Sequence, residues 1–247
     1  MSLKERVRSL VGHLFDQPFD NDAVDLYREL RRRALMTSAE YAEANMVGIP
    51  ILDDRYRLID HALQAVQKGG LYMEFGVYKG DSLNHIAKRV SGLDGGALIF
   101  GFDSFQGLPQ DWWSNLPEGS FRVDELPSVE SNVRLVKGWF DETLPKFVED
   151  RVGQKASFVH VDCDLYSSAR TVLSLLRKLD LNGAVLVFDE YFNYPGWQNH
   201  EFKAFQEYVK ECRVKYKYLG YCRRSEQVAV QITEVTADAA SAHNETQ

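Results

Sequence analysis

The chain has 247 residues, with 29 basic and 36 acidic side chains and a formal net charge of −7. This acidic balance disfavours a nucleic-acid partner, because proteins that bind the phosphate backbone usually present a basic face. No apolar run reaches the length of a membrane span, and the first residues lack the apolar core of a signal peptide. We therefore expect a cytoplasmic protein with no membrane partner.

The first part of the chain, residues 1–68, is predicted to be a helical extension. Apolar residues recur at helical spacing in 7–14, 23–30 and 58–66. The last of these segments follows Asp54, a suitable N-cap residue, and 46–52 is interpreted as an irregular apolar connector. The apolar helices offer a surface through which copies of the chain could form a homo-oligomer.

Residues 69–233 are predicted to form one α/β domain. Five apolar runs separated mostly by helical segments indicate parallel strands covered on both faces. Two further runs read as a closing antiparallel pair, which makes a mostly parallel sheet of seven strands. The tail, 234–247, has no periodic apolar residues and is predicted to be disordered. The seven expected strands are Leu71–Val77, Leu98–Ser104, Val133–Gly138, Ser157–Cys163, Ala184–Asp189, Arg213–Arg223 and Gln227–Thr233.

A glycine turn joins the first expected strand to a helix. The spacing Glu74-x-Gly76-x-x-x-Gly80 precedes a helical segment that begins near Ser82. Glycine lets the backbone approach a ligand closely, and the free N–H groups of a first helical turn attract an anion. The pattern predicts a nucleotide-type site, although it differs from the dinucleotide fingerprint. The alternative is a strand-turn-helix unit that binds nothing.

Two more strand ends carry candidate ligand contacts. Asp103 ends the second strand about 20 residues after the glycine turn, where an acid accepts hydrogen bonds from ribose hydroxyls. The alternative is an aspartate that starts a turn. Gly138 and Trp139, after the third strand, could form a flat wall for an adenine ring, or Trp139 could be part of the core.

The fourth and fifth strands both end in acids, Asp162 and Asp164 on one and Asp189 and Glu190 on the next. Carboxylates this close repel and raise one another's pKa unless a positive charge lies between them. A hard divalent cation such as Mg²⁺ suits these oxygen ligands. The alternative, which we expect for Asp164, is that one acid of each pair caps a helix and faces water.

Two histidines are candidate bases. His160 alternates with valines on an interior strand and is expected to be a core histidine. His200, in the aromatic and polar loop 192–200, is the better candidate for proton transfer. The loop itself suits the lining of an acceptor pocket or a structural turn with inward aromatic rings. The long insertion 111–127 is expected to act as a lid or to pack against the N-terminal helices.

As a set, these motifs resemble the macrocin-type O-methyltransferases, which use S-adenosylmethionine and a metal to methylate sugar hydroxyls on macrolide and aminocoumarin antibiotics. The resemblance runs from about Tyr72 to Tyr208 and implies a Rossmann-like class I methyltransferase fold. The strand-end acids are more distantly similar to those of catechol and caffeoyl-coenzyme A methyltransferases. The motifs are Glu74–Gly80, Phe102–Pro109, Gly138–Pro145, Asp162–Ser168 and Asp189–Tyr191.

The resemblance implies a role for each matched position. The methionine end of S-adenosylmethionine would be surrounded by Glu74, Gly76, Gly80 and Ser82. Its ribose would be held by Asp103 and Ser104, and its adenine would lie beside Gly138 and Trp139. The metal, Mg²⁺ or a similar cation, would be bound by Asp162, Asp189 and Glu190, with Asp162 also accepting the proton of the acceptor hydroxyl.

The chain departs from the family pattern at two places. Glu190 stands where the family usually has a second aspartate, and the only histidine after His200 is His243, in the tail. Two rival hypotheses are a metal-dependent nucleotide-sugar glycosyltransferase, based on the Asp-x-Asp of Asp162–Asp164, and a non-catalytic relative that binds the adenosyl group. The acceptor is expected to be a small molecule with a hydroxyl group, such as a sugar.

Overall fold

The computed structural model describes residues 25–112 and 116–236. The predicted helix over 7–14 and nearly all of the predicted disordered tail lie outside these residues. The helices are α2 (Leu26–Asn45), α3 (Arg55–Leu63), α4 (Asp81–Leu93), α5 (Phe140–Glu149), α6 (Tyr166–Leu176), η2 (Trp197–Asn199) and α7 (Glu201–Glu211). The strands are β1 (Ile51–Leu52), β2 (Leu71–Phe75), β3 (Ile99–Asp103), β4 (Val133–Lys137), β5 (Ala156–Val161), β6 (Val185–Phe188), β7 (Val214–Cys222) and β8 (Val228–Val235).

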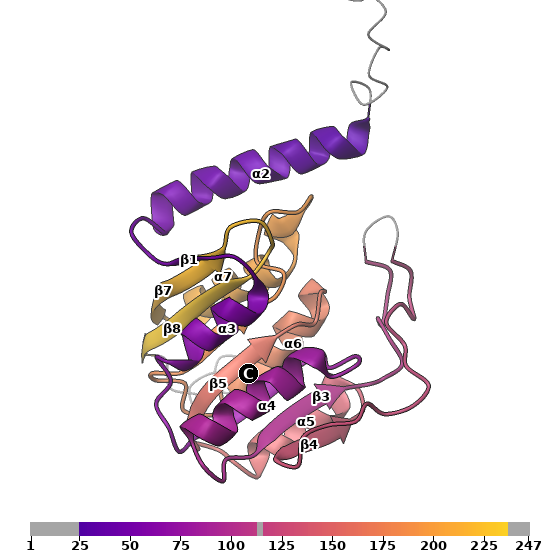
Figure 1. Ribbon diagram of the computed structural model, residues 1–247, viewed down its shortest axis with the longest axis vertical. Coiled ribbons are helices and arrows are strands. Elements are labelled where there is room, and N and C mark those ends of the chain that lie inside the picture. Colours follow the sequence, from indigo (N-terminus) through magenta and orange to yellow (C-terminus); the bar gives the residue numbers. More distant parts are fainter. Residues whose placement is uncertain (1–24, 113–115, 237–247) are drawn as a thin grey trace, which may run out of the picture.

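The strands form one sheet in the order β1-β7-β8-β6-β5-β2-β3-β4 (Figure 1). Strands β2 to β6 pair in parallel, and β8 is antiparallel to both β6 and β7. The mostly parallel α/β sheet with an antiparallel closing strand is confirmed.

Two details of the sheet differ from the prediction. It has eight strands rather than seven, because Ile51 and Leu52, expected in a connector, pair in parallel with the end of β7. Two residues are too few for an alternating pattern to reveal a strand. Strand β8 also continues to Val235, so the tail begins later than Glu234.

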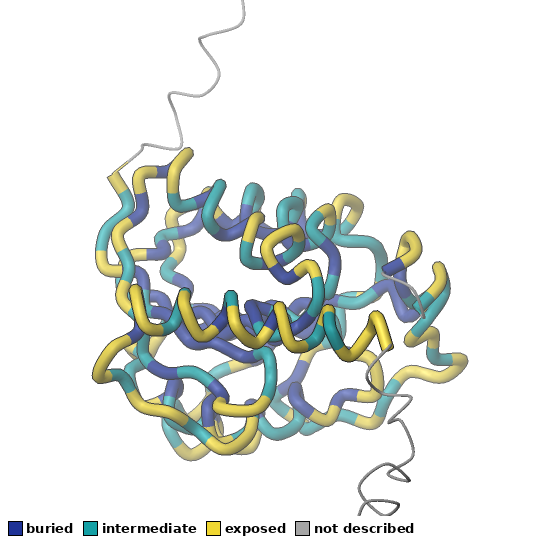
Figure 2. Tube along the Cα trace, turned by 90° about the horizontal axis from the view of Figure 1, so that it is seen from above, coloured by how far each residue is buried: buried dark blue, intermediate teal, exposed yellow. Residues whose placement is uncertain are grey.

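Each face of the sheet has its own hydrophobic core. Successive side chains of a strand point to opposite faces. Tyr72 thus packs with α3 and α4, whereas Met73 packs with α5, α6 and α7. The buried residues concentrate in the middle of the molecule, and α2 is largely exposed (Figure 2). In sheets of this kind, ligands bind beyond the carboxyl ends of the parallel strands.

Helix α2 is fixed to the domain by a cluster of tyrosine hydroxyls. Asp25 caps this helix by accepting hydrogen bonds from backbone N–H groups of its first turn. Farther along, the hydroxyl of Tyr41 lies 2.5 Å from that of Tyr218 on β7. The Tyr218 hydroxyl also lies 2.8 Å from that of Tyr191 and 3.2 Å from that of Tyr216. Tyr218 therefore links α2, the end of β6 and β7.

We expect Tyr218→Phe to lower the free energy of unfolding by about 1–3 kcal/mol, because it removes the hydroxyl that bonds to those of Tyr41, Tyr191 and Tyr216. Urea denaturation measures this change. Tyr221→Phe is the control, since that hydroxyl makes no hydrogen bond within the described part of the chain. Equal stability of the two variants would contradict a role for the cluster.

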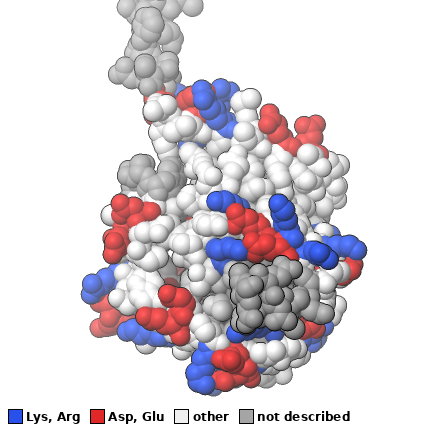
Figure 3. All heavy atoms as spheres, turned by 180° about the vertical axis from the view of Figure 1, so that it is seen from behind, with Lys and Arg blue, Asp and Glu red and all other residues white. Residues whose placement is uncertain are grey.

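The surface carries mixed charge. On the face in Figure 3, acidic and basic side chains alternate among the described residues. No helix of 25–112 or 116–236 has the length and apolar character needed to cross a membrane. The three cysteines are buried and form no disulfide: Cys163, Cys212 and Cys222.

Candidate active site

A cavity of about 290 Å³ opens where the parallel strands end. This is where ligands bind in open α/β sheets. Nine of the predicted site residues line it: Gly76, Ser82, Asp103, Ser104, Gly138, Trp139, Asp162, Asp189 and Glu190. Three others do not: Glu74, Gly80 and His200.

The glycine turn presses directly against the end of β5. Gly76 has φ +93°, and a Cβ atom there would lie only 1.6 Å from the carbonyl oxygen of Asp162. A larger residue would therefore collide with backbone. Gly80, also at positive φ, is the N-cap of α4. The turn thus brings the start of α4 and Asp162 to the same cavity.

Asp103 shapes this turn from the neighbouring strand. Its Oδ2 accepts hydrogen bonds from the backbone N–H groups of Val77 and Tyr78, at 2.8 and 2.9 Å. Its Oδ1 accepts one from Phe105, at 2.6 Å. Each carboxylate oxygen can accept two hydrogen bonds, so Oδ1 keeps capacity for a ligand. Asp103 therefore fixes the backbone of the cavity and also lines it.

Glu74 lies behind the cavity wall. It is fully buried, accepts a hydrogen bond from the Ser82 hydroxyl at 3.1 Å, and lies 3.0 Å from Nδ1 of His160. Ser82 lines the cavity and Glu74 does not. Glu74 thus positions a residue of the wall rather than forming it.

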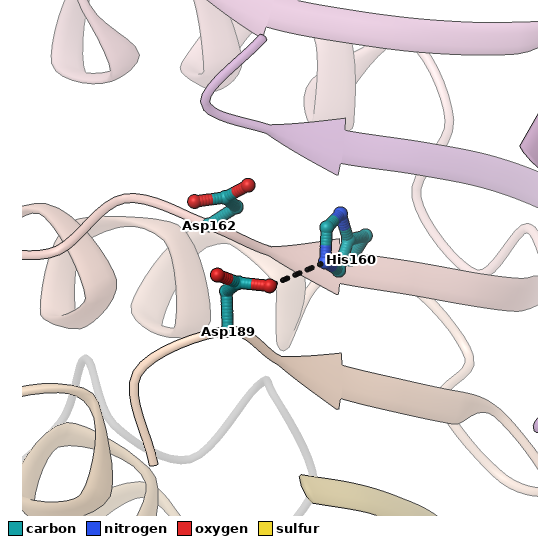
Figure 4. A group of neighbouring side chains, drawn as sticks. All are labelled: His160, Asp162 and Asp189. Atoms are coloured by element: carbon teal, nitrogen blue, oxygen red, sulfur yellow. Dashed lines mark ion pairs between the residues drawn. The ribbon is translucent and has the colours of Figure 1, made fainter. Parts of the chain in front are cut away.

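His160 is a core histidine, as expected, but it also reaches the acids (Figure 4). Its Nε2 lies 3.8 Å from Oδ1 of Asp189. Burial by itself lowers the pKa of His160, but the carboxylates of Asp189 and Glu74 outweigh this effect and hold the pKa well above its ordinary value. His160 thus lies between Glu74 and Asp189, and these carboxylates favour its protonated form.

The strand-end acids meet in two overlapping groups whose ligand atoms lie within 4.8 Å of one another. One contains His160, Asp162 and Asp189, and the other contains Asp162, Asp164 and Glu190. The three predicted ligands are thus divided between the groups, with Asp162 common to both.

Two buried carboxylate oxygens in these groups lack a hydrogen-bond partner among the described residues: Oδ1 of Asp189 and Oε2 of Glu190. Burial, reinforced by the neighbouring acids, raises the pKa of Asp162 and of Glu190 well above the ordinary range. Such oxygen donors fit a hard divalent cation.

Asp164 was expected to cap a helix and face water, and this was wrong. The N-cap of α6 is Leu165, which has no side-chain cap. Asp164 has φ +60° and lines the cavity. Burial, together with the charges of Asp189 and Asp103, raises its pKa to about 7. The left-handed backbone at this residue turns its side chain into the acidic groups.

Comparison with known proteins gives the class of this domain. Residues 73–191 match a family model described as "Methyltransferase domain". The matched part of the chain is a methyltransferase domain. Among curated proteins, none is similar enough to be matched with it.

Two solved structures share the fold of this methyltransferase. The calicheamicin methyltransferase CalS11 is 22% identical with a TM-score of 0.55, over 94% of this chain and 93% of CalS11. The O-methyltransferase NovP is 21% identical with a TM-score of 0.53, over 73% of this chain and 80% of NovP. The predicted Rossmann-like methyltransferase fold is thereby confirmed.

Arg55, the first residue of α3, was not predicted as a site residue from the sequence. Its guanidinium lines the cavity of the methyltransferase and lies 3.9 Å from Oδ2 of Asp189. Burial raises the pKa of Asp189, but His160 and Arg55 together with a hydrogen bond from Gln227 outweigh it, so the pKa is lowered. His160 and Arg55 therefore stabilise the ionised form of Asp189 without an added cation. Only its place in the fold distinguishes Arg55 from other arginines.

Glu201, the first residue of α7, was also missed. It is fully buried, and burial raises its pKa to about 8, although two backbone hydrogen bonds oppose this. Those bonds come from the N–H groups of Cys163 and Glu190, both at 3.1 Å. In the sequence Glu201 looks like an ordinary acid of a first helical turn.

His200 does not reach the cavity. It is the N-cap residue of α7, and its ring lies 6.3 Å from that of Trp112 and 6.0 Å from that of Tyr194. The loop aromatics Phe192, Tyr194 and Trp197 are buried, so the inward-packing interpretation of this loop is the correct one.

The insertion 111–127 lies beside the cavity. Trp112 and Phe121 line it, and Trp112 also packs against Tyr194. These contacts place the described part of the insertion next to the site.

Proposed function

We propose that the methyltransferase transfers a methyl group to a hydroxyl of a sugar or another vicinal diol, with the help of a divalent cation. The observation that supports this best is that one cavity is lined both by residues suited to a nucleotide-type donor and by acids suited to a cation. The glycine turn and Asp103 line it together with Asp162 and Glu190. A donor and a cation would therefore lie next to each other.

The type of acceptor has separate support. NovP, which shares the fold, is described as an O-methyltransferase, and CalS11 as a calicheamicin methyltransferase. The motifs resemble those of enzymes that methylate sugar hydroxyls. Oxygen is also the acceptor atom that a hard cation would bind, so a diol suits the acids of the cavity.

The donor would be held by residues of the first three parallel strand ends. Asp103 and Ser104 would bind the ribose hydroxyls, and Trp139 would lie against the adenine. Gly138 has φ +144°, and a Cβ atom there would lie 2.6 Å from Thr143. Gly76, Gly80, Ser82 and, through Ser82, Glu74 would shape the methionine end.

The cation would be bound by Asp162, Asp189 and Glu190. Asp189 and Glu190 each have an oxygen without a hydrogen-bond partner among the described residues, which fits this role. When bound, the cation would make an acceptor hydroxyl more acidic. Asp162 would then accept the hydroxyl proton at a carboxylate oxygen. The cavity walls would hold acceptor oxygen and methyl group in line, and such positioning supplies much of the acceleration.

Calorimetry tests the choice of donor. We expect S-adenosylmethionine and S-adenosylhomocysteine to bind, and a nucleotide sugar not to bind. Binding of the nucleotide sugar alone would support the glycosyltransferase hypothesis instead. Donor binding without any product from a panel of sugars and catechol-like diols would support the non-catalytic hypothesis.

Removal of divalent cations with EDTA should abolish methyl transfer and leave the affinity for S-adenosylhomocysteine nearly unchanged. Added Mg²⁺ should restore the activity. We expect this because the cation would bind Asp162 and Glu190, the acids with raised pKa values, whereas the donor would be held by Asp103. Transfer of radiolabelled methyl groups measures it, and full activity in EDTA would contradict cation assistance.

A further inference from the structure

We infer that Glu201 is a positioning residue that holds the two acidic strand ends at the spacing a cation requires. This inference rests on the proposed function, because it concerns the same acids. Glu201 itself does not line the cavity. It acts through the backbone of the residues that do.

The backbone hydrogen-bond ladder of the sheet ends at the first acid of each pair, Asp162 after β5 and Asp189 after β6. Two backbone N–H groups donate the last hydrogen bonds of the ladder. That of Asp162 donates to the carbonyl oxygen of Phe75, and that of Asp189 donates to the carbonyl oxygen of Val161, both at 2.9 Å. The next residue on each strand, Cys163 or Glu190, has left the ladder. A buried N–H group without an acceptor is costly, so each of these two needs a partner.

Glu201 supplies both acceptors. Its Oε1 accepts the N–H of Cys163, which stands between Asp162 and Asp164, and its Oε2 accepts the N–H of Glu190. Two strand ends are thereby joined through one planar carboxylate, and their separation is set by the span of its two oxygens. This extends the hydrogen bonding between β5 and β6 by one residue.

The usual role of an acid in a first helical turn does not account for this geometry. Such an acid interacts with the N–H groups of its own helix. Both oxygens of Glu201 instead accept from other segments, and the side chain is fully buried. Outer partners that fix metal ligands typically change metal affinity about 10–100-fold when they are replaced.

The test uses Glu201→Gln, which has nearly the same shape. The glutamine amide has one acceptor oxygen, and its NH₂ group would face the second backbone donor. One strand end must then move. The matched control is Glu207→Gln on the same helix, whose carboxylate accepts a hydrogen bond from the Tyr166 hydroxyl at 2.7 Å and does not line the cavity.

Free Mn²⁺, counted by electron paramagnetic resonance, gives the cation affinity, and calorimetry gives the affinity for S-adenosylhomocysteine. We expect Glu201→Gln to weaken Mn²⁺ binding about 10–100-fold without changing S-adenosylhomocysteine binding, and Glu207→Gln to change neither. If Glu201→Gln does not fold, Glu201→Asp, which is too short to reach both N–H groups, should show the same weakening.

Unchanged Mn²⁺ affinity in the variant, beside a wild type that binds both ligands, would overturn this role alone. So would equal losses of Mn²⁺ and S-adenosylhomocysteine binding, or failure of both Glu201 variants to fold, because Glu201 would then serve stability. A wild type that binds S-adenosylhomocysteine but no Mn²⁺ would overturn cation assistance, and this role with it.

Discussion

Asp162→Asn should lower methyl transfer by about 10²–10⁴-fold, the range for loss of a general base, and leave S-adenosylhomocysteine binding nearly unchanged. Asp162 is the residue shared by both acidic groups, so its side chain would contribute both a cation ligand and the proton acceptor. The contact with Gly76 is made by the Asp162 carbonyl, which the substitution retains. We therefore expect the substitution to lower the rate of methyl transfer without lowering the affinity for S-adenosylhomocysteine.

Single-turnover transfer from labelled donor and calorimetry with S-adenosylhomocysteine measure the two quantities. Asp150→Asn is the control, since Asp150 is exposed at the end of α5 and pairs with Lys146. If Asp162→Asn lost donor affinity as severely as turnover, the assigned roles would be wrong.

Gly76→Ala should disrupt the site more completely than any loss of a single carboxylate. The new Cβ atom would lie 1.6 Å from the carbonyl oxygen and 2.7 Å from the carbonyl carbon of Asp162, at φ +93°. Both partners are backbone, so neither can turn away. We expect the free energy of unfolding to fall by about 4 kcal/mol or more, the range of the most severe single substitutions.

Gly96→Ala separates the collision from the backbone strain. Gly96 has a similar φ of +87°, but a Cβ atom added there would meet nothing within 4 Å. We expect this control to lose only about 1–2 kcal/mol. Thermal unfolding and S-adenosylhomocysteine binding compare the two. Equal effects would mean that the contact between Gly76 and Asp162 does not organise the site.

The sheet could be predicted from the sequence because its signals are local. Apolar runs such as that of β5 end at acids, and parallel strands bring those ends together. The two-residue strand β1 has no such signal. The glycine turn could be recognised for the same local reason, although the close approach of Gly76 to Asp162 depends on how β2 and β5 pair.

The electrostatics of the site could not be predicted, because they depend on residues far apart in the chain. The acids were expected to need an external cation. The structure instead gives Asp189 two positive neighbours, Arg55 and His160, whereas Asp162 and Glu190 retain raised pKa values. The need for a cation is thus concentrated at Asp162 and Glu190 rather than shared equally.

The hydrogen bonds that hold the acidic strand ends could not be predicted from the sequence either. Glu201 lies 38 residues after Cys163. Nothing in its sequence context distinguishes it from another acid that begins a helix. Asp164 was misjudged for a related reason: aspartate before a helix usually caps it, and only the positive φ at this residue turns the side chain inward.

A crystal structure with S-adenosylhomocysteine and Mn²⁺, located by its anomalous signal, shows whether the acids bind an ion beside the donor. We expect the ion within about 2.0–2.3 Å of carboxylate oxygens of Asp162, Asp189 and Glu190, with the ribose on Asp103. An ion bound elsewhere, or a ribose that does not contact Asp103, would contradict this expectation.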